Sequence, residues 1–106
     1  MSGKYSRNKG KSGERELAAK LREHGFNARR GQQYCGANGD ADVIGLPGIH
    51  IEVKRTEKFR MYEALDQARL DAKADELPVV FTRKNKCDWV ACLRIDDFMS
   101  LYKETI

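Results

Sequence analysis

The sequence has no long apolar run and few cysteines or histidines, and these absences exclude several classes of protein. Its longest uninterrupted apolar stretch, from Trp89 to Leu93, is far short of the roughly 20 residues of a membrane-spanning helix. The polar, basic N-terminus has no apolar segment typical of a secretory signal. The three cysteines (Cys35, Cys87, Cys92) and two histidines (His24, His50) show no CxxC spacing, which argues against a disulfide framework or a zinc site. We therefore expect a cytoplasmic protein with reduced thiols.

What the chain does have is charge. Its 106 residues are 34% charged and 41% hydrophobic, proportions typical of one soluble globular domain. The net charge of +4 favours an anionic partner such as nucleic acid, although a basic protein without such a partner is an equal alternative on charge alone. Residues 1–12 carry basic side chains and no acid. We expect a flexible basic arm over residues 1–12, either solvated or holding phosphates, and a single domain over residues 13–106.

The pattern of apolar residues and breakers predicts an α/β domain in the order α-β-β-β-α-β-β-α. Helices are expected over residues 13–24 and 60–76, and a short C-terminal helix is expected to be capped by Asp96 or Asp97. Strands are expected over residues 26–30, 41–46, 49–55, 79–82 and 88–95. The apolar residues near the C-terminus could form core or an interface between subunits, and core is the favoured interpretation: Trp89, Phe98, Met99 and Leu101.

The segment IHIEVKR alternates strictly between apolar and polar residues. In a strand this alternation directs His50, Glu52 and Lys54 to one face. The Cα atoms of Glu52 and Lys54 would then lie ~6.6 Å apart. An exposed Glu-x-Lys on an edge strand is common, so this motif alone is weak support for a catalytic site.

Asp42 precedes this strand by a predicted hairpin. A two-residue turn at Pro47 and Gly48 would pair Asp42 with Val53 and direct it to the wrong face. A one-residue bulge would bring it to the face of Glu52. Asp40 is a second acid in the same stretch but lies in the expected loop.

Glu14 lies at the N-terminal end of the stripe formed by Leu17, Ala18 and Leu21. A carboxylate on a buried face needs a partner. The alternative is an acid that merely complements the helix dipole. Glu16 lies off the stripe and is expected to face solvent.

Two converged carboxylates favour a bound cation. At ~4 Å they repel by about 4 kcal/mol at an effective dielectric constant of about 20, and a cation removes that cost. Mg²⁺ prefers oxygen ligands and activates water for phosphodiester hydrolysis, with Mn²⁺ as a substitute. Lys54 would stabilise developing negative charge. No Ser-His-Asp or Cys-His arrangement is evident, and the loop GQQYCGANG lacks the Lys-Ser/Thr of a P-loop.

The pieces GERELAAKLREHGF, GDADVIG and HIEVKR stand in this order and resemble the PD-(D/E)XK nucleases, in particular archaeal-type Holliday junction resolvases and their small phage relatives. The resemblance implies a restriction-endonuclease-like mixed sheet flanked by helices, in a bacterial, archaeal or phage-infected cell. It implies that Asp42 and Glu52 bind metal together with the carbonyl of Val53, that Lys54 is catalytic and that Glu14 completes the site. Gln67 matches a glutamine that such resolvases carry on the following helix, although a solvent-facing Gln is an equal alternative. Ala41 departs from the usual Pro before the Asp.

The resemblance further implies a Mg²⁺-dependent endonuclease that acts on four-way DNA junctions as a homodimer. The alternatives are a nicking or restriction-like nuclease acting on duplex DNA and a non-catalytic DNA-binding protein. No recognition helix is evident, so we expect recognition of DNA shape. Phosphate contacts are expected from six basic residues: Lys4, Arg7, Lys9, Lys11, Arg29 and Arg30. Arg83, Lys84 and Lys86 are weaker candidates.

Overall fold

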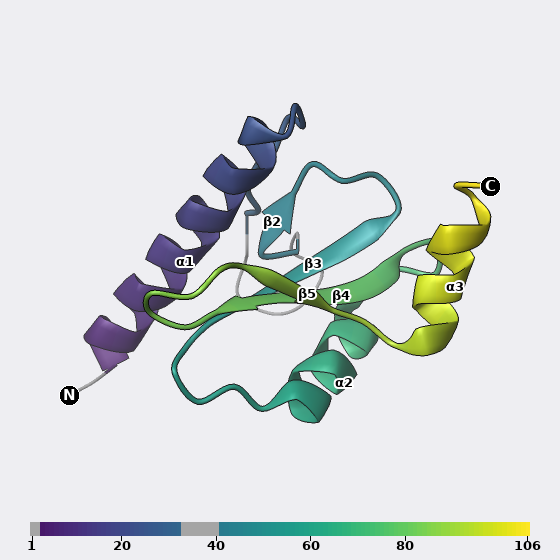
Figure 1. The fold of residues 1–106 in the computed structure, drawn as a ribbon. Coiled ribbons are helices and arrows are strands. Elements are labelled where there is room, and N and C mark those ends of the chain that lie inside the picture. The colour runs from purple at the N-terminus through teal and green to yellow at the C-terminus, as the bar shows by residue number, and fades with distance from the viewer. Residues whose placement is uncertain (1–2, 33–40) are drawn as a thin grey trace.

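The computed structural model describes residues 3–32 and 41–106, and side chains from residue 10 onward within these ranges. Figure 1 shows a central sheet with helices packed around it. The elements follow in the order α1 (Gly3–Glu23), β1 (Arg29–Arg30), β2 (Val43–Ile44), β3 (Ile49–Arg55), α2 (Met61–Asp71), β4 (Leu77–Arg83), β5 (Val90–Cys92) and α3 (Ile95–Lys103). The predicted order α-β-β-β-α-β-β-α, with a mixed sheet flanked by helices, is confirmed.

The five strands are hydrogen-bonded in their chain order, β1-β2-β3-β4-β5. Neighbours are antiparallel except β3 and β4, which are parallel. A parallel pair needs a crossover connection, and α2 supplies it. This crossover lays α2 across the sheet next to β3, the strand that carries the Glu-x-Lys motif.

β3 is a central strand covered on both faces. On one face, α1 contributes Leu17 and Ala18 to a buried cluster with Ile51 and Val53. On the other face, Ala64, Leu65 and Ala68 of α2 pack against Val80. The polar residues His50 and Glu52 alternate with Ile51 and Val53 and therefore project toward α2, where both are buried.

The structure shortens or shifts several predicted elements. α1 begins at Gly3, ten residues before the helix predicted to start at residue 13, so its N-terminal half includes most of the expected arm. The absence of Pro from this stretch permits the longer helix. α2 ends at Asp71, before the predicted end at residue 76. Pro78 lies inside β4 instead of preceding it. The division into an arm and a single domain stays a prediction.

α3 corrects the interpretation of the C-terminal apolar residues as core. It has no buried residue, and the side chains of Phe98 and Met99 are 46% and 40% exposed. Trp89 does pack against the core cluster next to α1. Arg94, not Asp96 or Asp97, occupies the N-cap position of α3. The described helices include none with the length and apolar character required to cross a membrane.

Candidate active site

The register between β2 and β3 decides where Asp42 lies. Val43 pairs with Ile51, so the preceding Asp42 lies opposite Glu52 and projects to the same side of the sheet. The connecting loop is wider than the predicted two-residue turn, and this shifts the pairing by one residue relative to a 42–53 pairing. Gly45 in the loop has a φ of +132°, and a Cβ there would lie 2.6 Å from the Cα of Ala28. The structure therefore brings Asp42 to the face of Glu52, as a one-residue shift was expected to do.

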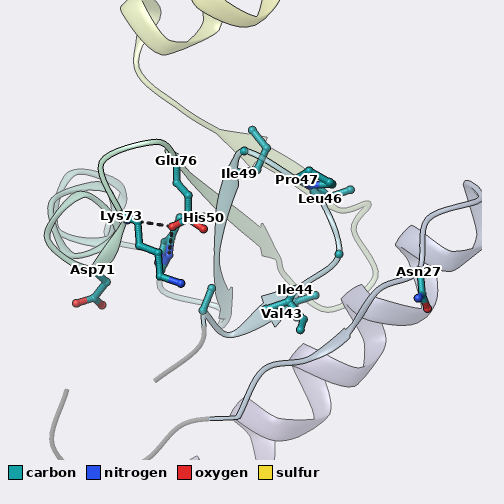
Figure 2. A pocket seen from close by; sticks show the side chains of 13 residues that line it. Asn27, Val43, Ile44, Leu46, Pro47, Ile49, His50, Asp71, Lys73 and Glu76 are labelled. Atoms are coloured by element: carbon teal, nitrogen blue, oxygen red, sulfur yellow. Dashed lines mark hydrogen bonds and ion pairs between the residues drawn. The ribbon is translucent and has the colours of Figure 1, made fainter. Parts of the chain in front are cut away.

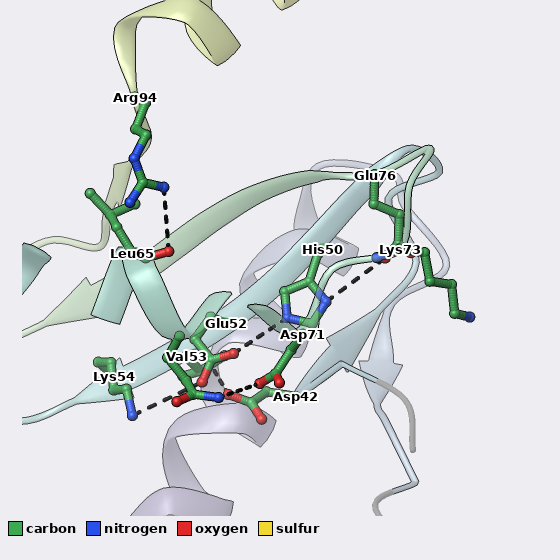
Figure 3. A network of polar contacts seen from close by, with 11 residues as sticks. Asp42, His50, Glu52, Val53, Lys54, Leu65, Asp71, Lys73, Glu76 and Arg94 are labelled. Carbon is green, nitrogen blue, oxygen red and sulfur yellow. Dashed lines mark hydrogen bonds and ion pairs between the residues drawn. The ribbon is translucent and has the colours of Figure 1, made fainter. Parts of the chain in front are cut away.

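Asp42 is fixed against the backbone of β3. Its Oδ2 accepts a hydrogen bond of 2.8 Å from the backbone N–H of Val53. Figure 3 shows Asp42 next to this part of β3, with the side chains of Glu52 and Lys54 beside it. Val53 contacts Asp42 through its backbone N–H. That the carbonyl oxygen of Val53 binds a metal ion stays a prediction.

Glu52 is a buried carboxylate whose two oxygens face different partners. Oε1 lies 3.3 Å from Nε2 of His50, and Oε2 lies 4.0 Å from Nζ of Lys54. On its other side, His50 approaches Glu76, with 3.9 Å between Nδ1 and Oε1. The hydrogen bond to Glu52 is the main cause of a raised pKa for His50, and burial opposes it.

Asp71, at the C-terminal end of α2, joins this group although the sequence did not single it out. One carboxylate oxygen of Asp71, one of Glu52 and a ring nitrogen of His50 all lie within 4.8 Å of one another. Gln67 donates a 3.0 Å hydrogen bond from Nε2 to Oδ2 of Asp71. Gln67 is thus exposed but connected to the site. The sequence feature that could have identified Asp71 is its position one helical turn after Gln67, which puts both side chains on one face of α2.

His50 was also missed as a site residue, although its place on the face of Glu52 and Lys54 was predicted. Two hollows adjoin the cluster. One, of about 410 Å³, is lined by residues that include His50, Asp71, Lys73 and Glu76 (Figure 2). The other, also about 410 Å³, is lined by residues that include Lys54 and Gln67. One hollow thus reaches His50 and Asp71, and the other reaches Lys54 and Gln67.

Glu14 is largely buried, as its position on the apolar stripe of α1 predicted, and it has a strong partner. Its Oε1 accepts a 2.9 Å hydrogen bond from Nε of Arg30. Arg30 pairs with Val43, a residue of the core cluster next to α1, so this ion pair lies on the α1 side of the sheet. Glu16 does not simply face solvent, because it lies 3.0 Å from Arg83 and 3.5 Å from Arg55.

The expected DNA-contacting residues occupy α1 and β1. Lys4, Arg7 and Lys9 lie in the N-terminal half of α1, but their side chains are outside the described part, as are Asp40 and Cys35. Lys11 and Arg29 are exposed, whereas Arg30 is committed to Glu14. Their role in binding DNA stays a prediction.

The donor set suits a hard divalent cation. Asp42 and Glu52 offer carboxylate oxygens from neighbouring strands, and Glu52 is 8% exposed. A buried carboxylate is costly unless its charge is balanced. Lys54 balances the charge of Glu52 only weakly, because its Nζ lies 4.0 Å from Oε2 and its side chain is 43% exposed. The residues therefore fit a metal ion chemically.

Comparison with known protein families agrees with this arrangement. A sequence model described as archaeal Holliday junction resolvase (Hjc) matches residues 5–96, which is most of the chain. Searches of curated proteins and of solved structures gave no match. The matched region includes α1 from residue 5 onward, the whole sheet and α2, and hence every residue assigned to the site. The chain therefore belongs to the archaeal Holliday junction resolvase family, within the PD-(D/E)XK nuclease superfamily.

Proposed function

We propose that the protein is a Mg²⁺-dependent endonuclease that hydrolyses phosphodiester bonds in branched DNA, with the four-way junction as its main substrate. The observation that carries this proposal is the register of β2 and β3, which sets Asp42 opposite Glu52 with Lys54 two residues further along β3. Membership of the resolvase family supports the junction as substrate. Mn²⁺ is expected to replace Mg²⁺, since both accept carboxylate and water ligands.

Asp42, Glu52 and the carbonyl of Val53 would hold the ion. The ion, when bound, supplies Lewis-acid activation of water and of the scissile phosphate. Lys54, whose side chain is 43% exposed, would stabilise charge on the phosphate oxygens. The hydrogen bond from the N–H of Val53 orients Asp42, which fixes one carboxylate before any ligand binds.

Two further residues would act around this centre. Gln67 lines the same hollow as Lys54 and hydrogen-bonds Asp71, so it is suited to orient groups that enter from that side. Glu14 would act through Arg30, by fixing the β1 edge of the site. Gln67 is thus a candidate to contact the substrate, whereas Glu14, on the α1 side of the sheet, would act as a positioning residue.

DNA would bind through basic residues that contact phosphates without reading bases. Lys4, Arg7, Lys9 and Lys11 would extend along α1, and Arg29 and Arg30 would follow on β1. Support comes from the net charge of +4. Such contacts make affinity fall steeply with salt.

The functional unit would be a homodimer, because a junction must be cut on two strands and each chain carries one site. Support for a partner surface comes from α3. Ile95, Phe98, Met99 and Tyr102 follow helical i, i+3, i+4, i+7 spacing, yet all are at least 40% exposed. A second copy covering this stripe would bury it.

The proposal is tested by incubating the purified protein with a four-way junction and with linear duplex of the same sequence, with Mg²⁺ or with a chelator. Wild-type protein should cut the junction only with Mg²⁺. Glu52→Gln should lower the rate by at least about 100-fold, since it removes a metal-binding charge. Glu23→Gln, an exposed acid at the end of α1, is the matched control and should cut normally.

Three outcomes distinguish the alternatives. Equal cutting of duplex and junction would favour a nicking or restriction-like nuclease. Junction binding with no cutting in any divalent ion would indicate a non-catalytic DNA-binding protein. Undiminished cutting by Glu52→Gln would overturn the assignment of the site.

A further inference from the structure

Glu52 presents one oxygen to each of two different environments. Its Oε2 faces Lys54 at 4.0 Å, on the side where the proposed catalysis takes place. Its Oε1 faces the imidazole Nε2 of His50 at 3.3 Å. Figure 3 shows His50 and Lys54 on opposite sides of the Glu52 carboxylate. The Oε1 side is therefore available for chemistry that the nuclease proposal does not use.

Asp71 supplies a third donor on the Oε1 side. Its carboxylate comes from α2 and not from the sheet, and one donor atom each of His50, Glu52 and Asp71 lie within 4.8 Å of one another. In a six-coordinate ion with ligands at about 2.1 Å, adjacent ligand atoms lie about 3.0 Å apart and opposite ones about 4.2 Å apart. The Nε2 of His50 and the Oε1 of Glu52 are already 3.3 Å apart, and rotation of the exposed Asp71 side chain would bring the third donor to the same ion. Gln67 already restrains Asp71 through a 3.0 Å hydrogen bond.

The surroundings of His50 would suit a metal-bound imidazole if an ion replaced the proton on Nε2. Its Nδ1 lies 3.9 Å from Oε1 of Glu76, while Nε2 points at the donor group. Metal-bound histidines are commonly held this way, with the second ring nitrogen directed at a carboxylate that fixes the ring. Glu76 is itself held, because its Oε1 accepts a 2.9 Å hydrogen bond from the backbone N–H of Lys73. The His50 side chain is 6% exposed, so its orientation is set by packing as well.

An ion and its water ligands have a route to these donors. His50, Asp71, Lys73 and Glu76 line one hollow of about 410 Å³ that opens to solvent (Figure 2). Asp71 is exposed and sits where this hollow meets α2. Water can therefore complete a coordination shell that has three protein ligands.

We propose that His50, Glu52 and Asp71 form a second cation site that prefers Mn²⁺ or a similar transition-metal ion to Mg²⁺, with Glu76 orienting the imidazole. The preference follows from the ligands, since imidazole nitrogen suits transition metals and Mg²⁺ favours oxygen. This inference rests on the proposed function in one respect, which is that the site shares Glu52 with the catalytic ion. One carboxylate oxygen would serve each ion.

The test is pulsed electron paramagnetic resonance of Mn²⁺ added to untagged, metal-free protein. Wild-type protein should show coupling of Mn²⁺ to an imidazole ¹⁴N, and His50→Gln should lose it. His24→Gln is the matched control, because His24 is the other histidine and is exposed at the end of α1, and it should keep the coupling. Glu76→Gln should keep the ligands and weaken Mn²⁺ binding about tenfold or more, as loss of an orienting partner does.

Absence of ¹⁴N coupling in Mn²⁺-saturated wild-type protein would overturn the inference, even if a variant failed to fold. Coupling that survives in His50→Gln would do the same. Neither result depends on DNA cleavage. A protein that cuts junctions but shows no coupling would lose only the second site, whereas one that shows coupling but cuts no DNA would lose only the proposed function.

Discussion

His50 is buried between two carboxylates, an environment in which the protonated ring is favoured. Nε2 lies 3.3 Å from Glu52 and Nδ1 3.9 Å from Glu76. The hydrogen bond to Glu52 and the charges of Glu52 and Glu76 raise the pKa of His50, and desolvation opposes them less strongly. In the metal-free protein the imidazolium would therefore balance negative charge on this side of β3.

This raised pKa gives a prediction for the stability of the metal-free protein. A group whose pKa is higher in the folded than in the unfolded state stabilises the fold fully below its unfolded pKa. For His50 this is a pH below 6.5, its ordinary pKa, and the stabilisation is lost as pH rises through the raised folded value. In chelator, the free energy of unfolding of the wild type relative to His50→Gln should therefore decline with rising pH over this window.

Urea unfolding at a series of pH values, with the ring titrated by NMR, measures both quantities. His24→Gln should keep the pH dependence of the wild type, because His24 is exposed. A His50 ring that titrates at or below its ordinary pKa would contradict the prediction.

Among the elements, α1 makes an unusually close approach to the sheet. A Cβ placed on Gly13 would lie 2.5 Å from the Cβ of Arg55, at the end of β3. The side chain of Arg55 continues to Glu16 of α1, with 3.5 Å between Nε and Oε1. Glycine at this position therefore permits the helix to pack where α1, β3 and Glu14 meet.

Gly13→Ala should consequently destabilise the protein, although Ala favours helix over Gly by about 1 kcal/mol. Overpacking of this kind costs about 1–3 kcal/mol. Gly10→Ala is the matched control in the same helix, because a Cβ there meets no atom within 4 Å, and it should be neutral or stabilising. Urea unfolding compares the two variants, and equal stability of both would refute the close-approach argument.

At the scale of the whole molecule, the stripe on α3 is an apolar surface that the described part of the fold leaves exposed. Ile95 is 73% exposed, and the rings of Phe98 and Tyr102 stack with 6.1 Å between centroids. Arg94 anchors the start of α3 to α2 through a 2.7 Å ion pair with Asp66. This ion pair holds the start of α3 near α2, while Phe98 and Tyr102, 46% and 49% exposed, line an apolar hollow beside Ile49 and Phe81 of the sheet.

If a second copy covers this stripe, Met99→Glu should shift the protein from dimer to monomer. The charge would be buried without a partner in the dimer but would remain solvated in the monomer. Sedimentation equilibrium measures the mass directly. Tyr62→Asp, at a 75% exposed apolar position on α2, is the control and should leave the mass unchanged. A wild-type protein that sediments as a monomer at all concentrations would contradict the homodimer.

The sequence by itself determined the features that depend on local periodicity. The alternation of IHIEVKR placed His50, Glu52 and Lys54 on one face, and β3 occupies the predicted residues 49–55. The helical stripe of α1 predicted that Glu14 would be buried, and the pattern of apolar residues and breakers predicted the element order α-β-β-β-α-β-β-α. Such patterns are readable because each residue's direction follows from its neighbours in the chain.

The tertiary structure decided what depends on contacts between distant segments. A one-residue difference in strand register moves a side chain to the other face, so the sequence left Asp42 open, and the pairing of Val43 with Ile51 settles its side of the sheet. Likewise, only the α2 crossover brings Asp71 to within 4.8 Å of Glu52 and His50. These placements depend on how loops close and helices pack, which local periodicity does not specify.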